Sequence, residues 1–187
     1  MEEDIQKAVK VLMAGGTILY PTDTIWGIGC DATNNRAVQK IYKIKERLKK
    51  SSFIILLEKE SKITDYVEKV PDILWDLLKS IDSPTTVIYP KAKNLTKNVI
   101  APDGSIGIRV VKDEFCRRMI SEFNKPVVST SANFSGEASP LVFKDISEEI
   151  KNKVDYIVKT NRNKLNKIKA STIIRIKLSG EFEVLRQ

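Results

Sequence analysis

Apolar residues recur along the chain at two spacings, which predict alternating helices and strands. In residues 3–14 they return every three to four positions, which predicts an amphipathic helix that two glycines end. The apolar run at residues 17–20 predicts a short buried strand that leaves the sheet at Pro21. Asn34 is a preferred N-cap, so the helical spacing after it predicts a second helix, which ends in a cluster of basic residues.

The same two spacings continue to the end of the chain. They predict strands at residues 53–57, 85–89, 106–111, 127–130 and 156–159, helices at residues 71–78, 114–123 and 143–153, and a final hairpin of residues 172–177 and 181–185 that turns at Ser179-Gly180. Strands that read as continuous apolar runs are usually covered on both faces of their sheet. We therefore expect an α/β or α+β fold, in which helices pack on a twisted mixed sheet.

The composition indicates one globular domain. The 187 residues are 42% hydrophobic and 30% charged, which suits one sizeable core and is too little chain for two ordinary domains. The longest apolar run, residues 53–57, is far shorter than the roughly 20 residues that span a bilayer, and the acidic N-terminus does not resemble a signal peptide. Cys30 and Cys116 stand far apart without a pairing pattern. We expect a cytoplasmic protein with no membrane partner.

The charge balance indicates anionic ligands. The formal net charge of +8 favours nucleotides, pyrophosphate, nucleic acid or acidic lipid without choosing among them. The chain has no histidine, which excludes Ser-His-Asp and Cys-His catalysis and histidine-based metal sites. Any metal would therefore be a hard cation held by oxygen, most simply Mg²⁺ bound to substrate phosphates.

Two motifs place polar groups where a predicted element ends. Residues 20–24, Tyr-Pro-Thr-Asp-Thr, put hydroxyls and a carboxylate at a strand exit, where α/β sheets bind ligands. The alternative is an ordinary turn in which Asp23 and Thr24 satisfy the local backbone. Lys45, Arg47 and Lys49 follow the second helix and suit a triphosphate or a carboxylate. Here the alternative is a solvated helix end whose cations favour the C-terminal dipole.

Two further motifs lie on or after later strands. Residues 129–133, Ser-Thr-Ser-Ala-Asn, follow a buried strand and could hold phosphate, ribose or a carboxylate, or else form a polar turn or helix cap. Arg109 stands within an apolar strand, where an unpaired charge is costly to bury. Its side chain either clamps an anion or reaches solvent at a sheet edge. Each motif alone leaves both interpretations open.

Taken in order along residues 15–186, the motifs resemble those of the YrdC/TsaC family, the threonylcarbamoyl-AMP synthases. The matching segments are the Tyr-Pro-Thr-Asp-Thr run, Lys45-x-Arg47, Ser83-Pro84-x-Thr86, Gly107-x-Arg109, Ser129-x-Ser131-Ala132-Asn133 with Ser135-Gly136, Ser171-Thr172-Ile173 and Leu185-Arg186. The resemblance implies a single catalytic domain over residues 1–187, with a twisted sheet folded around a basic concave cavity and no additional C-terminal domain.

The resemblance also implies a reaction. ATP, L-threonine and bicarbonate or CO₂ would give L-threonylcarbamoyladenylate and pyrophosphate, with Mg²⁺ carried by ATP and no organic cofactor. Threonylcarbamoyl-transfer proteins would then pass the group to the adenosine next to the anticodon of tRNA, and tRNA itself is a further candidate partner. No covalent catalytic residue is implied, because this chemistry rests on positioning and charge neutralisation, for which Lys45 and Arg47 would be most important.

The family motifs assign individual residues to the two main substrates. The resemblance puts Thr22, Arg109, Ser129 and Ser171 at threonine, and Lys45, Arg47, Lys49, Ser105, Ser131, Asn133, Ser139 and Arg186 at ATP. The basic segment 159–169 is predicted to be a mobile loop and a candidate lid.

Two other functions fit part of the sequence. A non-catalytic RNA-binding module of YrdC-like fold would suit the charge of +8, but it leaves unexplained why hydroxyls cluster at three strand ends. A carbamoyl-adenylate-forming module, of the kind found in hydrogenase-maturation proteins, occurs in longer chains with zinc-finger and acylphosphatase parts, which 187 residues cannot hold.

Overall fold

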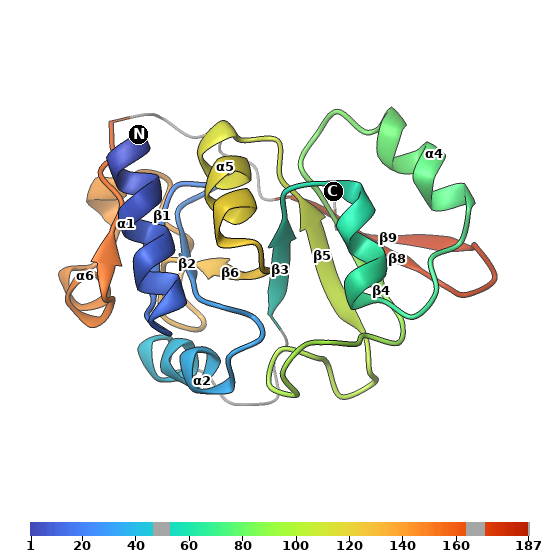
Figure 1. Cartoon of the computed structure of the whole chain (residues 1–187), viewed down its shortest axis with the longest axis horizontal. Helices are drawn as coiled ribbons and strands as arrows, with labels where there is room; N and C mark the ends of the chain where they lie inside the picture. Colours follow the sequence, from blue (N-terminus) through green and yellow to red (C-terminus); the bar gives the residue numbers. More distant parts are fainter. Residues whose placement is uncertain (47–52, 164–170, 187) are drawn as a thin grey trace.

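The structure, a computed structural model, describes residues 1–46, 53–163 and 171–186 (Figure 1). The predicted site residues Arg47 and Lys49, and residues 164–169 of the predicted loop, lie outside the described residues. The α-helices are α1 (Glu2–Met13), α2 (Asn35–Ile44), α3 (Ile63–Tyr66), α4 (Ile73–Ser80), α5 (Glu114–Phe123) and α6 (Glu148–Lys153), and the short 3₁₀ helices are η1 (Glu60–Lys62) and η2 (Phe143–Asp145). Within the described ranges, no helix is both long enough and apolar enough to cross a membrane.

The strands of the described residues form one mixed sheet. They are β1 (Ile18–Tyr20), β2 (Gly27–Gly29), β3 (Ile54–Leu57), β4 (Thr85–Tyr89), β5 (Ile106–Val110), β6 (Val127–Ser131), β7 (Tyr156–Ile157), β8 (Thr172–Ile176) and β9 (Phe182–Arg186). Their order across the sheet is β7-β1-β2-β6-β3-β5-β4-β8-β9. The β1–β7, β3–β5 and β4–β8 pairs are parallel and the other pairs antiparallel. This mixed sheet with packed helices confirms the predicted fold class.

Successive residues of the strands pack on opposite faces of the sheet, in two hydrophobic clusters. Leu56 and Val127 belong to the cluster formed with α1 and α5, whereas their neighbours Ile55 and Val128 belong to the cluster formed with α2, α3, α4 and α6. Figure 1 shows α1 and α5 lying side by side over their part of the sheet. Farther along the strands, the side chains that point to the same face as α1 and α5 are often small or polar. These side chains line a cavity.

The structure corrects two predicted elements. The helix predicted at residues 143–153 is wrong as one element, because Ile146 is extended and Ser147 caps a new helix by accepting from the backbone N–H of Ile150. The strand predicted at residues 156–159 is limited to Tyr156–Ile157, because the N–H of Lys159 donates to the carboxylate of Asp4 and not to a neighbouring strand. β2 was not predicted, since its Gly-Ile-Gly sequence lacks a strand pattern.

Asp4 ties α1 to the segment after β7. Its buried carboxylate accepts from Tyr156 Oη at 2.5 Å, from the backbone N–H groups of Lys159 and Thr160 at 3.1 and 2.8 Å, and from Thr160 Oγ1 at 2.6 Å. Burial acts to raise the pKa of Asp4, but these hydrogen bonds outweigh it and lower the pKa to about 2. The folded state therefore favours the ionised carboxylate.

The lowered pKa predicts an acid-sensitive contribution to stability. Since the folded pKa lies below the unfolded one, the contribution is complete above about pH 4 and is lost as pH falls toward 2. Asp4→Asn should lower the free energy of unfolding by about 1–3 kcal/mol at pH 7 and flatten its pH dependence between about pH 4 and 2. Urea unfolding at several pH values measures both effects. Glu3→Gln, the adjacent exposed carboxylate of α1, is the control, and equal losses in the two variants would contradict this role for Asp4.

Candidate functional site

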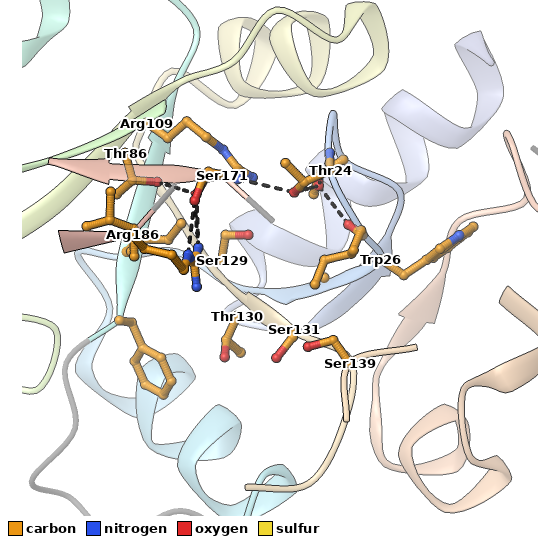
Figure 2. A pocket seen from close by; sticks show the side chains of 16 residues that line it. Thr24, Trp26, Thr86, Arg109, Ser129, Thr130, Ser131, Ser139, Ser171 and Arg186 are labelled. Carbon is orange, nitrogen blue, oxygen red and sulfur yellow. Dashed lines mark hydrogen bonds between the residues drawn. The ribbon is translucent and has the colours of Figure 1, made fainter. Parts of the chain in front are cut away.

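A cavity of about 250 Å³ opens on the sheet where hydroxyl-bearing side chains replace apolar ones (Figure 2). It is lined by Thr22, Thr24, Ile25, Trp26, Gly27, Phe53, Ile54, Thr86, Arg109, Ser129, Thr130, Ser131, Ser139, Ser171, Ile173 and Arg186. Among the described residues, this lining contains two guanidinium groups and no carboxylate. The cavity therefore suits an anionic ligand that makes many hydrogen bonds.

An adjoining groove of about 460 Å³ extends the cavity along β4, β5 and β8. The strand register builds its floor, because Ile54 lies opposite Gly107 on one side and Gly107 lies opposite Ile88 on the other. A Cβ atom on Gly107 would lie 2.9 Å from Ile54 Cγ2. Because Gly107 has no side chain, the groove reaches down to the backbone at this position. The groove is mainly apolar and joins the hydroxyl-lined cavity at Ile54.

Ser105 lies at the far wall of the groove. Its hydroxyl donates to Asp103 Oδ1 at 2.6 Å, and its backbone N–H donates to the same oxygen at 3.0 Å. These bonds hold the pKa of Asp103 below its usual value. Because the hydroxyl proton is used within the protein, Ser105 Oγ would face a ligand as a hydrogen-bond acceptor.

The segment after β1 forms one wall of the cavity through a chain of hydrogen bonds. Thr22 Oγ1 donates its proton to the carbonyl of Ile25 at 2.7 Å. In the 3.0 Å hydrogen bond between the two hydroxyls, Thr24 Oγ1 is therefore the donor and Thr22 Oγ1 the acceptor. Arg109 Nη1 in turn donates to Thr24 Oγ1 at 3.2 Å. Arg109 is only 3% exposed and lies in the middle of the sheet, which excludes the alternative of a side chain reaching solvent at an edge.

The opposite wall is formed by Thr86 on β4, Ser171 just before β8 and Arg186 on β9. Thr86 and Ser171 share a hydrogen bond of 2.9 Å between their hydroxyls. Arg186 Nη2 and Nε donate to the carbonyl of Ser171 at 2.8 and 3.1 Å, as Figure 2 shows. This pairing holds the guanidinium of Arg186 at the cavity although β9 is the exposed edge strand.

Lys45 connects the end of α2 to the loop after β6. Its ammonium group donates to the carbonyls of Ser131 and Asn133 at 2.7 and 2.6 Å and to Asn133 Oδ1 at 3.2 Å. The lysine is buried, so these bonds replace water around its charge. The alternative of a solvated helix end is therefore wrong for Lys45. Its position beside Ser131 brings a positive charge next to the cavity wall.

The structure brings most of the predicted site residues together. Seven of them line the one cavity, namely Thr22, Arg109, Ser129, Ser131, Ser139, Ser171 and Arg186. Ser105 lies in the adjoining groove, and Lys45 and Asn133 lie directly behind Ser131. Sequence reasoning gave no role to the cavity residues Thr86 and Thr130. Thr86 is part of the Ser83-Pro84-x-Thr86 motif, and that motif was the available signal.

The described residues contain no cluster of three histidine, cysteine or carboxylate side chains that could hold a metal ion. The fold and the cavity thus define a class of protein: a mixed α/β domain with a cationic, hydroxyl-rich pocket for a small anionic ligand.

Comparisons with known proteins identify the family. The Sua5/YciO/YrdC family model, described as telomere recombination, matches residues 10–187. The threonylcarbamoyl-AMP synthase of Pseudoalteromonas translucida is 32% identical over 160 residues, which cover 84% of this chain and 86% of that protein. The threonylcarbamoyl-AMP synthase of Coxiella burnetii (strain RSA 331) is 31% identical over 181 residues, which cover 96% of both.

The structural comparison agrees at the level of the fold. The crystal structure of P. abyssi Sua5 complexed with L-threonine superposes with a TM-score of 0.86 at 24% identity, covering 94% of this chain and 52% of that one. The chain belongs to the Sua5/YciO/YrdC family. Its match to the synthases identifies it as an enzyme of the nucleotidyltransferase type.

Proposed function

We propose that the chain is an L-threonylcarbamoyladenylate synthase that uses ATP, L-threonine and bicarbonate or CO₂. The observation that carries this proposal is the convergence of seven predicted substrate residues, from segments far apart in the sequence, on one cavity whose described lining residues include no carboxylate. The relatives that cover most of the chain carry the name of this activity, and one solved relative binds L-threonine. The product would serve the threonylcarbamoyl modification of tRNA through transfer proteins.

The proposed places of the two large substrates follow from the two connected spaces. The carboxylate of threonine suits Arg109, with Thr22, Ser129 and Ser171 around the amino acid. The phosphates suit Ser131 and Ser139, with Lys45 behind Ser131, and Arg186, whose guanidinium lies beside Ser171. The mainly apolar groove beyond Ile54 suits the adenine base, with Ser105 as an acceptor for its amino group.

The proposed chemistry needs no covalent nucleophile in the protein. The ammonium group of threonine loses a proton to solvent, and the resulting amine attacks the carbon of CO₂. The nitrogen then loses a second proton to solvent, which gives the carbamate anion. A carbamate oxygen then attacks the α-phosphorus of ATP as the bond to pyrophosphate breaks. Positioning and charge neutralisation are the main demands of such a transfer, and guanidinium groups with hydroxyl donors meet them. Mg²⁺ would arrive with ATP, because the described cavity lining has no carboxylate to bind it independently.

A three-substrate assay tests the proposed function. Pyrophosphate release from ATP is expected only when L-threonine and bicarbonate are both present. Release that is unchanged without threonine, or absent with all three substrates, would contradict the synthase function. Salt-dependent tRNA binding without threonine-dependent turnover would favour the alternative RNA-binding module.

A further inference from the structure

Asp23 is the acidic side chain that contacts Arg109. The distance from Asp23 Oδ1 to Arg109 Nη2 is 3.2 Å, and the two side chains are 9% and 4% exposed. Arg109 lines the cavity, whereas Asp23 does not. The carboxylate therefore lies behind the guanidinium and cannot meet a ligand in the cavity directly.

The contact between the two groups is electrostatic in character. Neither carboxylate oxygen of Asp23 has a hydrogen-bond partner of good geometry in the described structure, and Arg109 Nε lacks one as well. A buried carboxylate held in this way is costly unless its charge is opposed. Burial raises the pKa of Asp23, the charge of Arg109 opposes that rise, and Asp113 adds to it. The charge of Arg109 thus favours the ionised form of Asp23 against the effect of burial.

We propose that Asp23 is a positioning residue for the binding of the amino-acid carboxylate, because it holds the guanidinium of Arg109 at the cavity although Asp23 itself does not line that cavity. Thr24 holds the same guanidinium at a second point. Its hydroxyl accepts a hydrogen bond from Arg109 Nη1 and donates one to Thr22 Oγ1. This inference rests on the proposed function, in which Arg109 binds threonine.

A free arginine side chain has many rotamers, and ordering it on binding would weaken affinity. Asp23 and Thr24 anchor two different nitrogens of Arg109 before any ligand arrives. Asp23 does not act as the base for the amine, because it does not line the space where the amine would bind. Its effect should therefore appear in threonine affinity, with little effect on the chemical step.

The charge of Asp23 should also make threonine affinity depend on pH. The groups that face Asp23 are Arg109 on β5, Asp113 and Cys116 at the start of α5, and Tyr20 on β1. The pKa values of Cys116 and Tyr20 are raised by burial, so neither group titrates in the acid range. As pH falls through the raised pKa of Asp23, the carboxylate loses its charge and Arg109 loses its anchor. Threonine affinity should fall over that range.

The test is calorimetric titration of the full chain with L-threonine and, separately, with ATP. Asp23→Asn keeps the shape of the side chain and removes its charge. We expect a loss of about tenfold or more in threonine affinity, ATP affinity within about twofold of the wild type, and no fall in threonine affinity with acidification. Asp113→Asn is the matched control, because Asn also caps α5. It should keep the wild-type threonine affinity near neutral pH, and the fall in affinity should move to lower pH, because the charge of Asp113 helps to raise the pKa of Asp23.

The outcomes separate this inference from the proposed function. If the wild type binds no L-threonine, the proposed function fails. If it binds threonine but Asp23→Asn binds equally well or more tightly, or loses ATP affinity to the same extent, only the role of Asp23 is overturned. Should Asp23→Asn fail to fold, the wild-type pH series decides. Threonine affinity that stays constant down to the onset of acid unfolding overturns the role.

Discussion

Replacing Lys45 with methionine is expected to weaken ATP binding by about 10- to 100-fold, or about 1–3 kcal/mol, and to destabilise the fold as well. The ammonium group of Lys45 donates to the carbonyls of Ser131 and Asn133, and both bonds are shorter than 2.8 Å. Methionine has a similar length but no donor, so it would leave three acceptors, the two carbonyls and Asn133 Oδ1, without this donor. A buried acceptor left unpaired costs about 1–3 kcal/mol, which predicts a lower free energy of unfolding.

Two measurements separate the effects of Lys45→Met. Urea unfolding reports stability, and ATP titration under conditions where the variant is folded reports affinity. Lys43→Met is the matched control, since Lys43 is exposed on the last turn of the same helix and should tolerate the change. Wild-type ATP affinity in Lys45→Met would show that the lysine only supports the loop, and wild-type stability would contradict its buried hydrogen bonds.

Local sequence signals predicted the regular elements well. The observed bounds of α5 are those predicted, because Asp113 accepts from the N–H of Cys116 at one end and Asn124 adopts a left-handed conformation at the other. α2 likewise begins after Asn34, whose side chain accepts from the N–H groups of Arg36 and Ala37. Caps and apolar spacing are properties of neighbouring residues, so they can be read without knowing the fold.

Elements determined by distant contacts were predicted less well. β2 is a strand because its backbone pairs with β1 and β6, and a Cβ atom on Gly29 would lie 2.7 Å from both Tyr20 Cε1 and the carbonyl of Val128. That crowding requires glycine, a residue that argues against a strand in sequence alone. In residues 143–153, Ile146 and Ile150 are both buried at helical spacing although the chain is not helical at Ile146.

In the candidate site, too, local groups could be predicted from the sequence, whereas their partners from distant segments could not. Clusters of hydroxyls and charges after strands indicated where ligand groups would gather, and the cavity contains most of them. The partners of those groups depend on strand register, which brings Thr86 on β4 beside Ser171, the residue just before β8. The ion pair of Asp23 with Arg109 likewise joins the end of β1 to β5, which are not adjacent in the sheet. No spacing within the sequence encodes these contacts.

Arg109 should be the most sensitive position for threonine. Arg109→Met removes the proposed carboxylate ligand and leaves the buried carboxylate of Asp23 without its counter-ion. Breaking a buried ion pair by removing one partner costs about 3–5 kcal/mol, so the variant should be strongly destabilised and should show no saturable threonine binding. Arg109→Lys keeps the charge but loses the planar fork, and its threonine affinity should fall by about 100-fold.

A double variant separates stability from binding. Asp23→Asn combined with Arg109→Met removes both charges, so it should regain much of the stability that Arg109→Met loses, because no uncompensated charge stays buried. It should nevertheless bind no threonine, since the carboxylate ligand is still absent. Urea unfolding and threonine titration of the single and double variants, with the exposed Arg117→Met as a control, measure these effects. Restored threonine binding in the double variant would mean that Arg109 stabilises the sheet without contacting the substrate.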